Sequence, residues 1–328
     1  PVYRTLTTQL LPFALGLLLL GVDVRCLLRT GPRALAAMAI GAGSIILGAP
    51  VAAWMLRREL PPDAWTGVGA LVGTWTGGSM NLVALRSILQ TPESIFPSLI
   101  IVDAAITYGW MALLMWCSRL QAPIERWLRA RPLGEIATNL SSPDAAQPCT
   151  VRRGLLCLLL AVGLALTAQV AARVCPVTSL MTSASGWAIV LVTTLTLSVS
   201  VIPAVRRLGP CATKVGYPCL YLVLAAIGTQ ARLSALSSAP VWIAVGISVA
   251  CFHAMCMLVG GRLLRLPLGL LATASHANFG GVVSAPLVGA VYHQNLAPVG
   301  LLLAIGANAL GTYAGLLSAW GCRVLLQQ

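Results

Sequence analysis

Charged residues are scarce in this chain of 328 residues. Asp, Glu, Lys and Arg together make up 9% of it and only eight residues are acidic, whereas 58% are hydrophobic. A soluble domain carries about 25% charged residues, most of them on its surface. The composition therefore excludes an ordinary water-soluble globular fold, and lipid is expected to be the main solvent of the chain.

The signatures of several enzyme and pump classes are also lacking. The sequence has no Gly-x-x-x-x-Gly-Lys-Ser/Thr phosphate loop, which argues against direct use of ATP. It has no His-Glu-x-x-His, no Gly-x-Ser-x-Gly and no pair of acids inside hydrophobic segments, so an intramembrane enzyme is disfavoured. We expect no enzymatic activity and no cofactor other than Na⁺ or H⁺ as a coupling ion.

The ten cysteines include no Cys-x-x-Cys pair, and most lie in or beside apolar segments, where Cys packs as a small hydrophobe. The sequence therefore predicts no disulfide framework. Cys251, His253 and Cys256 form the one cluster with metal-capable atoms. On a helix Cys251 and His253 point to different faces, so helix packing is favoured over a metal site.

Long hydrophobic stretches dominate what is present. Each is close to the ~20 residues that a helix needs to cross the hydrocarbon core of a bilayer. The sequence predicts an all-α integral membrane protein with about ten transmembrane helices. These ten segments are residues 6–24, 34–56, 64–90, 95–117, 155–173, 187–205, 214–229, 240–261, 267–291 and 297–320.

A polar stretch divides these segments into two groups. Residues 119–153 form a linker between a first membrane repeat, 1–118, and a second, 154–328, and residues 123–131 could form a short amphipathic helix on the membrane surface.

The formal net charge is +13, but the basic residues sit singly or in pairs at segment ends, which favours membrane topology over nucleic-acid binding. Fifteen of the twenty-one Lys and Arg residues fall at the N-terminus or in even-numbered gaps. The opposite side has Arg25, Arg29, Arg33, Arg173 and Arg232, and Arg86 lies near the end of the third segment. The positive-inside rule then places both termini of this chain on the cytoplasmic side. Membrane lipids are the expected surroundings, and a homodimer is one expected assembly.

The two halves resemble each other at four places offset by 203–207 residues. Gly21-Val-Asp-Val-Arg25 parallels Gly228-Thr-Gln-Ala-Arg232, and Leu60-Pro61 parallels Leu266-Pro267. Thr76-Gly-Gly78 parallels Phe279-Gly-Gly281, and Asp103-Ala-Ala-Ile-Thr107 parallels Asn308-Ala-Leu-Gly-Thr312. Such duplication is typical of secondary transporters. The matched segments are six apart, so the repeats would be parallel unless one segment between them does not cross the membrane.

Each half contains a Gly-Gly pair among polar residues inside a hydrophobic segment. Adjacent glycines weaken a helix, and non-helical backbone in a bilayer survives where protein or a water-filled cavity satisfies it. We expect a broken helix crossing at mid-membrane in each half. The alternative is that Gly73, Gly77 and Gly78 allow close helix packing and that the asparagines bond between helices. The candidate substrate and ion ligands here are Thr76, Gly77, Gly78, Ser79, Asn81, His276, Asn278, Gly280, Gly281 and Ser284.

Asp103 is the one acidic residue in the interior of a hydrophobic segment, because Asp23 lies at the end of the first. An intramembrane carboxylate costs about 3 kcal/mol or more and indicates function by default. Asp103 could bind a cation or carry a proton, with Thr107 one turn away and Asn308 as its counterpart in the repeat; the alternative is neutralisation by a structural partner such as Arg86. A Na⁺ site at Ser79, Asn81 and Asp103 is expected. His276 either titrates or donates to a neighbouring carbonyl, and the second is slightly favoured.

The motifs Gly73-Thr-Trp-Thr-Gly-Gly-Ser-Met-Asn81, Ile101-Val-Asp-Ala104 and Ser275-His-Ala-Asn-Phe-Gly-Gly281 resemble a membrane family known as domain of unknown function 819. That family is similar to the group of bile-acid/sodium symporters and sodium/proton antiporters, in which two broken helices cross between a core and a panel domain. In the symporters a Gly-Gly followed by Ser-Asn helps hold sodium, which Gly78, Ser79 and Asn81 resemble.

The second acidic sodium ligand of those symporters has no counterpart here, because Asn278 and Ser284 are uncharged. The resemblance also implies two further helices before the residue that matches Pro1. The sequence thus predicts a secondary active transporter of a small solute, coupled to Na⁺ or H⁺. The alternatives are a non-transporting, degenerate membrane scaffold and, less favoured, an intramembrane enzyme.

Overall fold

The computed structural model describes residues 9–22, 30–132, 149–178, 183–228 and 239–326, and these residues form helices and no strands. Asp23, Arg25, Arg29 and Arg232, which the repeat comparison and the charge count use, lie outside them. The helices are α2 (Leu11–Leu19), α4 (Pro32–Met55), α5 (Ala64–Gly77), α6 (Ser79–Leu89), α7 (Phe96–Cys117), η2 (Ser118–Leu120), α8 (Gln121–Leu128), α9 (Val151–Ala172), α10 (Ala184–Ser200), α11 (Pro203–Arg206), α12 (Gly209–Gly228), α13 (Ala239–Leu264), α14 (Leu268–Phe279), α15 (Ser284–Tyr292) and α16 (Leu296–Leu326).

Local sequence explains where several helices begin. Pro32 opens α4 directly after Gly31, which has φ +86°, and Pro is favoured in the first turn because its missing N–H would be unpaired there anyway. Thr150 and Ser183 cap α9 and α10, accepting hydrogen bonds from the N–H groups of Arg153 and Gly186.

Five of the described helical stretches are long and apolar enough to cross a membrane: 32–55, 96–128, 151–172, 239–264 and 296–326. The finer prediction of about ten spans is not confirmed. Helices α5, α6, α14 and α15 have 14, 11, 12 and 9 residues. At 1.5 Å per residue each is about 14–21 Å long, which is well short of the ~30 Å hydrocarbon core.

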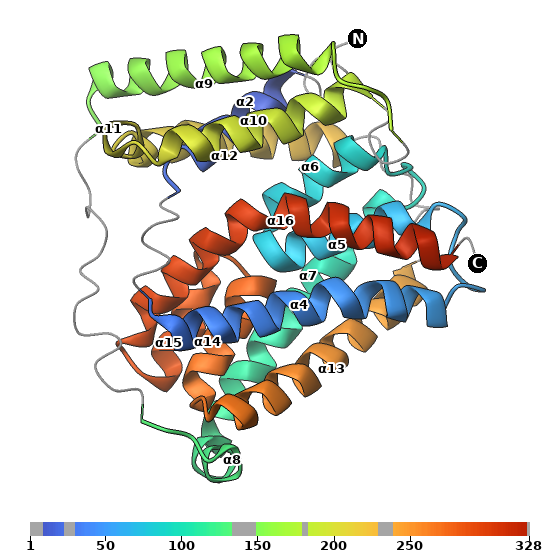
Figure 1. The fold of residues 1–328 in the computed structure, drawn as a ribbon, viewed down its shortest axis with the longest axis vertical. Coiled ribbons are helices and arrows are strands. Elements are labelled where there is room, and N and C mark those ends of the chain that lie inside the picture. Colours follow the sequence, from blue (N-terminus) through green and yellow to red (C-terminus); the bar gives the residue numbers. More distant parts are fainter. Residues whose placement is uncertain (1–8, 23–29, 133–148, 179–182, 229–238, 327–328) are drawn as a thin grey trace.

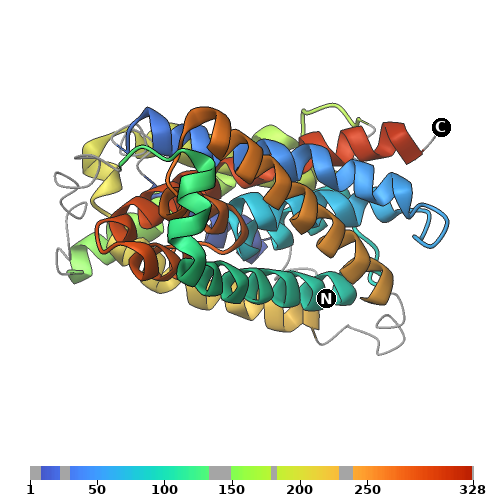
Figure 2. The same ribbon diagram turned by 90° about the horizontal axis from the view of Figure 1, so that it is seen from below.

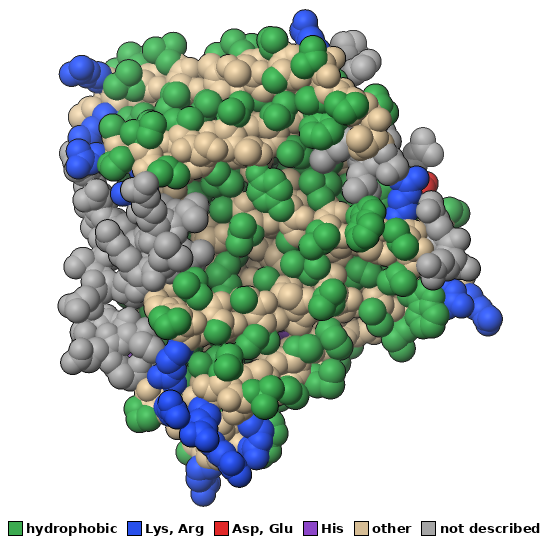
Figure 3. All heavy atoms as spheres, viewed as in Figure 1, with side chains coloured by type: hydrophobic (Ala, Val, Ile, Leu, Met, Phe, Trp, Pro, Cys, Tyr) green, Lys and Arg blue, Asp and Glu red, His purple; other side chains and the backbone are tan. Residues whose placement is uncertain are grey.

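The helices pack as two groups (Figure 1). Helices α2, α9, α10 and α12 form one layer, held together by small apolar cores around Leu17, Ala161 and Ala165. The other helices, apart from the short α11 beside α10, form a larger group. Trp75, Phe96 and Trp242 are fully buried in the main core, which also includes residues of the first layer such as Leu15, Ile189 and Val223. Many leucines and valines remain exposed on the outside, among them Leu47 and Leu159, as expected where lipid surrounds the chain (Figure 3).

Helices α5 and α6 form an antiparallel hairpin whose tip is Gly78. A side chain on Gly77 would meet Asn81, one on Gly73 would meet Leu85, and one on Gly69 would meet Leu89. These pairs step away from Gly78 in opposite directions along the chain, so α6 folds back on α5. The broken helix crossing at mid-membrane, expected for this segment, is therefore not confirmed.

Helices α14 and α15 form a second hairpin around Gly280 and Gly281. Gly269, near the start of α14, packs against Tyr292 at the end of α15. The Tyr292 hydroxyl donates to the Leu114 carbonyl on α7, 2.5 Å away, which fixes the base of this hairpin. Here too the two pieces return to the same end, and a crossing broken helix is not confirmed.

The two hairpins enter from opposite ends of the long helices. At the α8 end, Glu125 of α8 accepts from the N–H of Leu268, the first residue of α14. At the other end, which we call the Trp65 end, the guanidinium of Arg323 near the end of α16 lies 5.1 Å from the ring of Trp65 at the start of α5. Figure 2 shows α8 lying across the direction of α7, whereas the long helices run side by side.

The charge count from the sequence is wrong for Arg33. Its guanidinium donates to the carbonyls of Arg131, Pro132 and Arg265, so Arg33 lies at the α8 end with residues that the count placed on the opposite side. The count assumed that residues 64–90 cross the membrane once, and the hairpin removes that crossing. Figure 3 shows most Lys and Arg side chains at the left edge and lower tip, which is the α8 end.

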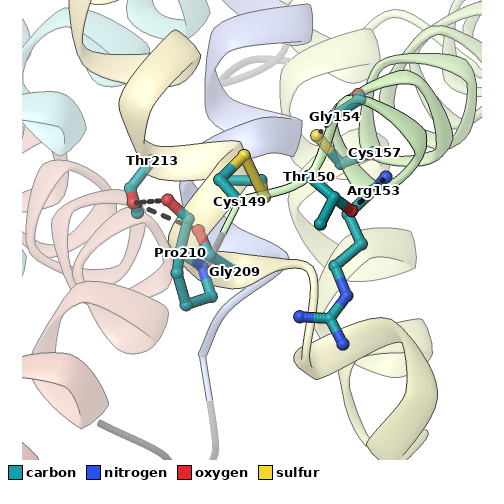
Figure 4. Close-up of a disulfide and its surroundings, with 9 residues drawn as sticks. Cys149, Thr150, Arg153, Gly154, Cys157, Gly209, Pro210 and Thr213 are labelled. Atoms are coloured by element: carbon teal, nitrogen blue, oxygen red, sulfur yellow. Dashed lines mark hydrogen bonds between the residues drawn. A yellow bond between two sulfur atoms is a disulfide. The ribbon is translucent and has the colours of Figure 1, made fainter. Parts of the chain in front are cut away.

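One disulfide joins Cys149 to Cys211 (Figure 4). It links the end of the 119–153 linker to the start of α12, across a separation of 62 residues. The prediction of no disulfide is wrong here, because only the packing of α9 on α12 brings these two residues together. Beside the bond is a cleft of about 670 Å³ that Thr150, Arg152, Arg153 and Arg207 help to line.

Candidate functional site

The tip of the first hairpin depends on Gly78. Its φ of +77° lies in the left-handed region, where a side chain is disfavoured, and a Cβ there would lie 3.1 Å from the side-chain oxygen of Asn308. Gly73 and Gly77 have a different role. They pack against Gly311 of α16, where backbones approach closely, as the packing alternative predicts.

Asn81 links this tip to α16. Its amide donates to the Gly77 carbonyl (2.5 Å) and to the Asn308 carbonyl (3.3 Å), and its oxygen accepts from Thr312 (2.6 Å). Asn81 is buried, whereas Ser79 is exposed. Thr76 is also buried, but its hydroxyl donates to the Val72 carbonyl within its own helix, so no ligand role is visible for it.

Asp103 of α7 connects the two hairpins. Its Oδ1 accepts from Thr74 of α5 at 3.2 Å and lies 3.4 Å from the Thr107 hydroxyl. The Thr107 hydroxyl is also 3.1 Å from the carbonyl of Phe279, at the tip of the second hairpin. Four oxygens from three elements thus converge, and oxygen is the ligand type that hard cations take in proteins.

The structural alternative for Asp103, an ion pair with Arg86, is not found between these two described residues. The Arg86 guanidinium lies 3.5 Å from Glu93 and packs over the ring of Phe96. Nor does any hydrogen bond among the described residues join Ser79, Asn81 and Asp103 as one sodium site. Asn81 belongs to the first tip with α16, whereas Asp103 faces α5 and the second tip.

The second tip contains buried polar groups without partners. His276 is fully buried, and neither ring nitrogen has a hydrogen-bond partner among the residues that the structure describes. The favoured expectation, that His276 donates to a neighbouring carbonyl, is therefore not confirmed. Asn278 is also buried; its amide donates to the carbonyls of Met38 and Ala274, while its oxygen is unpaired.

Gly280 and Gly281 lie in the turn between α14 and α15, and Ser284 is the first residue of α15. Gly281 has φ +134°, a conformation that glycine tolerates. A Cβ on Gly280 would collide with both the His276 Nε2 and the Ser284 Oγ, so these two polar atoms flank the Gly280 α-carbon.

A buried polar network beside the tips could not be recognised from the sequence. His253 of α13 bonds through Nδ1 to Ser44 of α4 (2.8 Å) and through Nε2 to Ser275 of α14 (2.8 Å), and Trp110 of α7 donates to Ser275 (2.9 Å). Phe279 packs against the rings of both His253 and Trp110. The sequence signal for this network is a histidine, His253, inside an apolar segment; its neighbours Cys251 and Cys256 made it resemble part of a metal cluster instead.

The sequence of this chain matches a known protein family. Residues 1–324 match the model described as protein of unknown function, DUF819. The chain belongs to this family. It is also 23% identical over 335 residues to the uncharacterized membrane protein YjcL of Bacillus subtilis (strain 168), an alignment that covers 96% of this chain and 83% of YjcL.

Membership of the DUF819 family agrees with the apolar helices in making this a membrane protein. The matched range includes both hairpin tips, Asp103 and the His253 network. The family description and the name of the relative assign no activity, so any activity must be argued from the hairpin tips.

Proposed function

We propose that this DUF819 protein is a secondary active transporter of a small solute, coupled to Na⁺ or H⁺. The observation that carries the proposal is the position of Asp103, which contacts Thr74 of the first hairpin and, through Thr107, the Phe279 carbonyl at the tip of the second. A charged side chain that contacts both hairpins can couple its neutralisation by a cation or a proton to a movement of the hairpins.

The cost of burying a carboxylate supports a role for a cation here. A charged Asp at the centre of a membrane costs about 3 kcal/mol or more, and the hydroxyls of Thr74 and Thr107 do not neutralise it. A bound Na⁺ would take oxygens of Asp103, Thr74 and Thr107 and the Phe279 carbonyl as ligands. A proton would neutralise the same carboxylate without other ligands.

Hairpins that enter from opposite ends of the long helices suit alternating access. Movement of one hairpin tip can open the site to one side of the membrane, and movement of the other can open it to the opposite side. The contacts of α4 with α13 support an inverted repeat: Gly41 packs on His253 and Met257, and Ile40 packs on Gly260, an antiparallel pattern. If the first hairpin does not cross, α4 and α13 are an odd number of crossings apart, which removes the difficulty that the sequence offset posed.

The layer of α2, α9, α10 and α12 is the proposed frame against which the hairpin group moves. The main core extends into both groups, and α10 makes direct contacts between them: Gly186 lies beside Ile88 of α6, and Thr194 bonds to Tyr313 of α16 at 2.8 Å. A relation to the bile-acid/sodium symporter group stays part of this proposal. Two groups of helices would fit a core and a panel, whereas the folded-back hairpins differ from that group's crossing helices.

The test is the thermal stability of detergent-purified protein in Na⁺, Li⁺, K⁺ and at several pH values, since a ligand of the native state raises apparent stability. We expect Na⁺ or H⁺ to raise Tm in wild type and not in Asp103→Asn. Thr273→Val is the matched control, because the Thr273 hydroxyl donates within α14 to Gly269, away from the tip. Asn81→Ala should lower Tm and keep the ion response, because Asn81 does not contact Asp103.

The outcomes separate the candidates. A Na⁺-specific shift that Asp103→Asn abolishes supports sodium coupling, and a pH response that is lost only in Asp103→Asn supports proton coupling. If no ion or pH change stabilises the wild type, coupled transport is contradicted, and the non-transporting scaffold becomes the better description.

A further inference from the structure

The second hairpin tip has groups that attract negative charge, on the far side of one peptide unit from Asp103. The Phe279 carbonyl faces Thr107 and, beyond it, Asp103. The next α-carbon, that of Gly280, lies between the His276 Nε2 and the Ser284 Oγ. The Phe279–Gly280 peptide thus has an oxygen-rich face for a cation and a donor-rich face.

The donor-rich face contains three kinds of unused hydrogen-bonding group. His276 is fully buried with both ring nitrogens unpaired. Helix α15 begins without a side-chain cap, and no hydrogen bond from the N–H groups of Val282, Val283 or Ser284 is found among the described residues. The Ser284 hydroxyl is a further donor. Free N–H groups at a helix start attract anions, and a buried donor without a partner is costly.

We propose that this tip binds a carboxylate group of the transported solute, through the His276 imidazole, the Ser284 hydroxyl and the N–H groups at the start of α15. The inference rests on the proposed transport function and makes the substrate a small organic acid. The buried His276 imidazole then gains a carboxylate oxygen, which offsets the cost of burying it without a partner, and the Ser284 hydroxyl and the N–H groups at the start of α15 add further donors.

The same geometry gives a reason for coupling. An anion that approaches the tip while Asp103 is ionised meets a like charge across the Phe279–Gly280 peptide. A cation or proton on Asp103 removes that repulsion, so the carboxylate binds well only after Asp103 is neutralised. We therefore expect carboxylate binding to depend on the coupling ion in wild type and to lose that dependence in Asp103→Asn.

The experiment measures Tm of purified protein against acetate, lactate, succinate and glutamate, with succinamide as the uncharged control, in Na⁺ and in K⁺ at two pH values. At least one carboxylate should stabilise the wild type when the coupling ion is present, and succinamide should not. His276→Phe, which keeps the ring and removes the donors, should weaken the apparent affinity at least about tenfold and retain the Na⁺ or pH response. Ser284→Ala should weaken it less, and Thr273→Val should leave it unchanged.

Two results would overturn the inference while the proposed function stands. In the first, Na⁺ or H⁺ raises the Tm of the wild type and no carboxylate of the panel raises it further. In the second, succinamide raises Tm as much as the carboxylates do. Retention of carboxylate binding in both His276→Phe and Ser284→Ala would also overturn it. If His276→Phe fails to fold, Ser284→Ala, whose side chain is only half-buried, decides the question alone. If the Tm of the wild type does not respond to any ion or to pH, the proposed function itself is contradicted.

Discussion

At the scale of single residues, small differences in side chain separate the roles of neighbouring positions. Gly77 and Gly78 are adjacent, yet Gly77 packs on the backbone of Gly311 while Gly78 supplies a positive φ at the turn. His253 and His276 are both buried, yet His253 has Ser44 and Ser275 as partners while His276 has none. A group that has no internal partner in a folded protein is a better candidate for a ligand than one that is already satisfied.

Gly78→Ala should destabilise the protein by about 1–2 kcal/mol, because a Cβ disfavours the left-handed conformation and would also press on Asn308. Gly43→Ala is the matched control: Gly43 is in α4 with open space around its α-carbon, and a helical Gly→Ala change there should be neutral or stabilising by up to about 1 kcal/mol. Thermal unfolding in detergent measures both. Equal effects of the two changes would contradict the turn assigned to Gly78.

At the scale of elements, the decisive feature is that both Gly-Gly segments fold back on themselves. The first hairpin buries its own seam, with Leu85 against Gly73 and Leu89 against Gly69, and α16 packs along it through Gly311 and Gly315. Short helices of this kind leave their ends beside neighbouring helices, while turn residues such as Ser79 and Val283 remain exposed. At the first tip the reversal leaves backbone groups paired, because the N–H groups of Gly78 and Asn81 donate to the carbonyls of Thr74 and Gly78.

Cross-linking tests the hairpin directly. In a cysteine-free background that also carries Ala319→Gly, Gly69→Cys with Leu89→Cys should be joined by a short thiol-specific linker, because residues 69 and 89 are in contact. Shortening Leu89 and removing the Ala319 methyl relieve the two closest contacts of the new side chain. In one continuous helix the same twenty-residue separation would span about 30 Å. Single-cysteine variants are the controls. Failure to link under conditions in which both thiols react would exclude the hairpin.

At the scale of the whole molecule, the arrangement of charge and the disulfide give opposite indications of sidedness. The α8 end carries Arg33, Arg131 and Arg265 together, and by the positive-inside rule it should face the cytoplasm. Helix α9 also begins at this end, next to the Cys149–Cys211 bond, and disulfides are rare on a reducing side. We expect the charge bias, and not the disulfide, to indicate the correct orientation in the membrane, because the charge bias depends on many residues.

The sidedness expected from the structure reverses the expectation from the sequence count. Helix α16 runs from the α8 end to the Trp65 end, so its C-terminus should lie opposite the cytoplasm. A C-terminal fusion should therefore give alkaline phosphatase activity in bacteria, whereas a fluorescent-protein fusion should stay dark. Labelling of Cys149 and Cys211 from the cytoplasmic side, after reduction of the bond between them, is the companion measurement. The opposite reporter pattern would assign the oxidising side to the α8 end.

The sequence by itself determined the features that depend on local chemistry. Scarce charge and long apolar runs indicated a membrane protein of helices, the Gly-Gly pairs marked the positions where helices end, and Asp103 stood out as a carboxylate inside an apolar segment. The motifs around these residues also indicated the family. The membrane class and the family are confirmed, while the site residues remain predictions.

Only the tertiary structure decided the direction of the chain after each Gly-Gly break. A Gly-Gly pair permits both a kink and a reversal, and the choice depends on distant partners: Gly311 and Gly315 of α16 for the first hairpin, and Leu114 of α7 for the second. The reversal changes the number of crossings, and with it the side of Arg33. The same non-local packing gave Asp103 its partners on α5 and α14 and brought Cys149 to Cys211. Hydrophobicity acts residue by residue, whereas chain direction is set by contacts between segments that are far apart in the sequence.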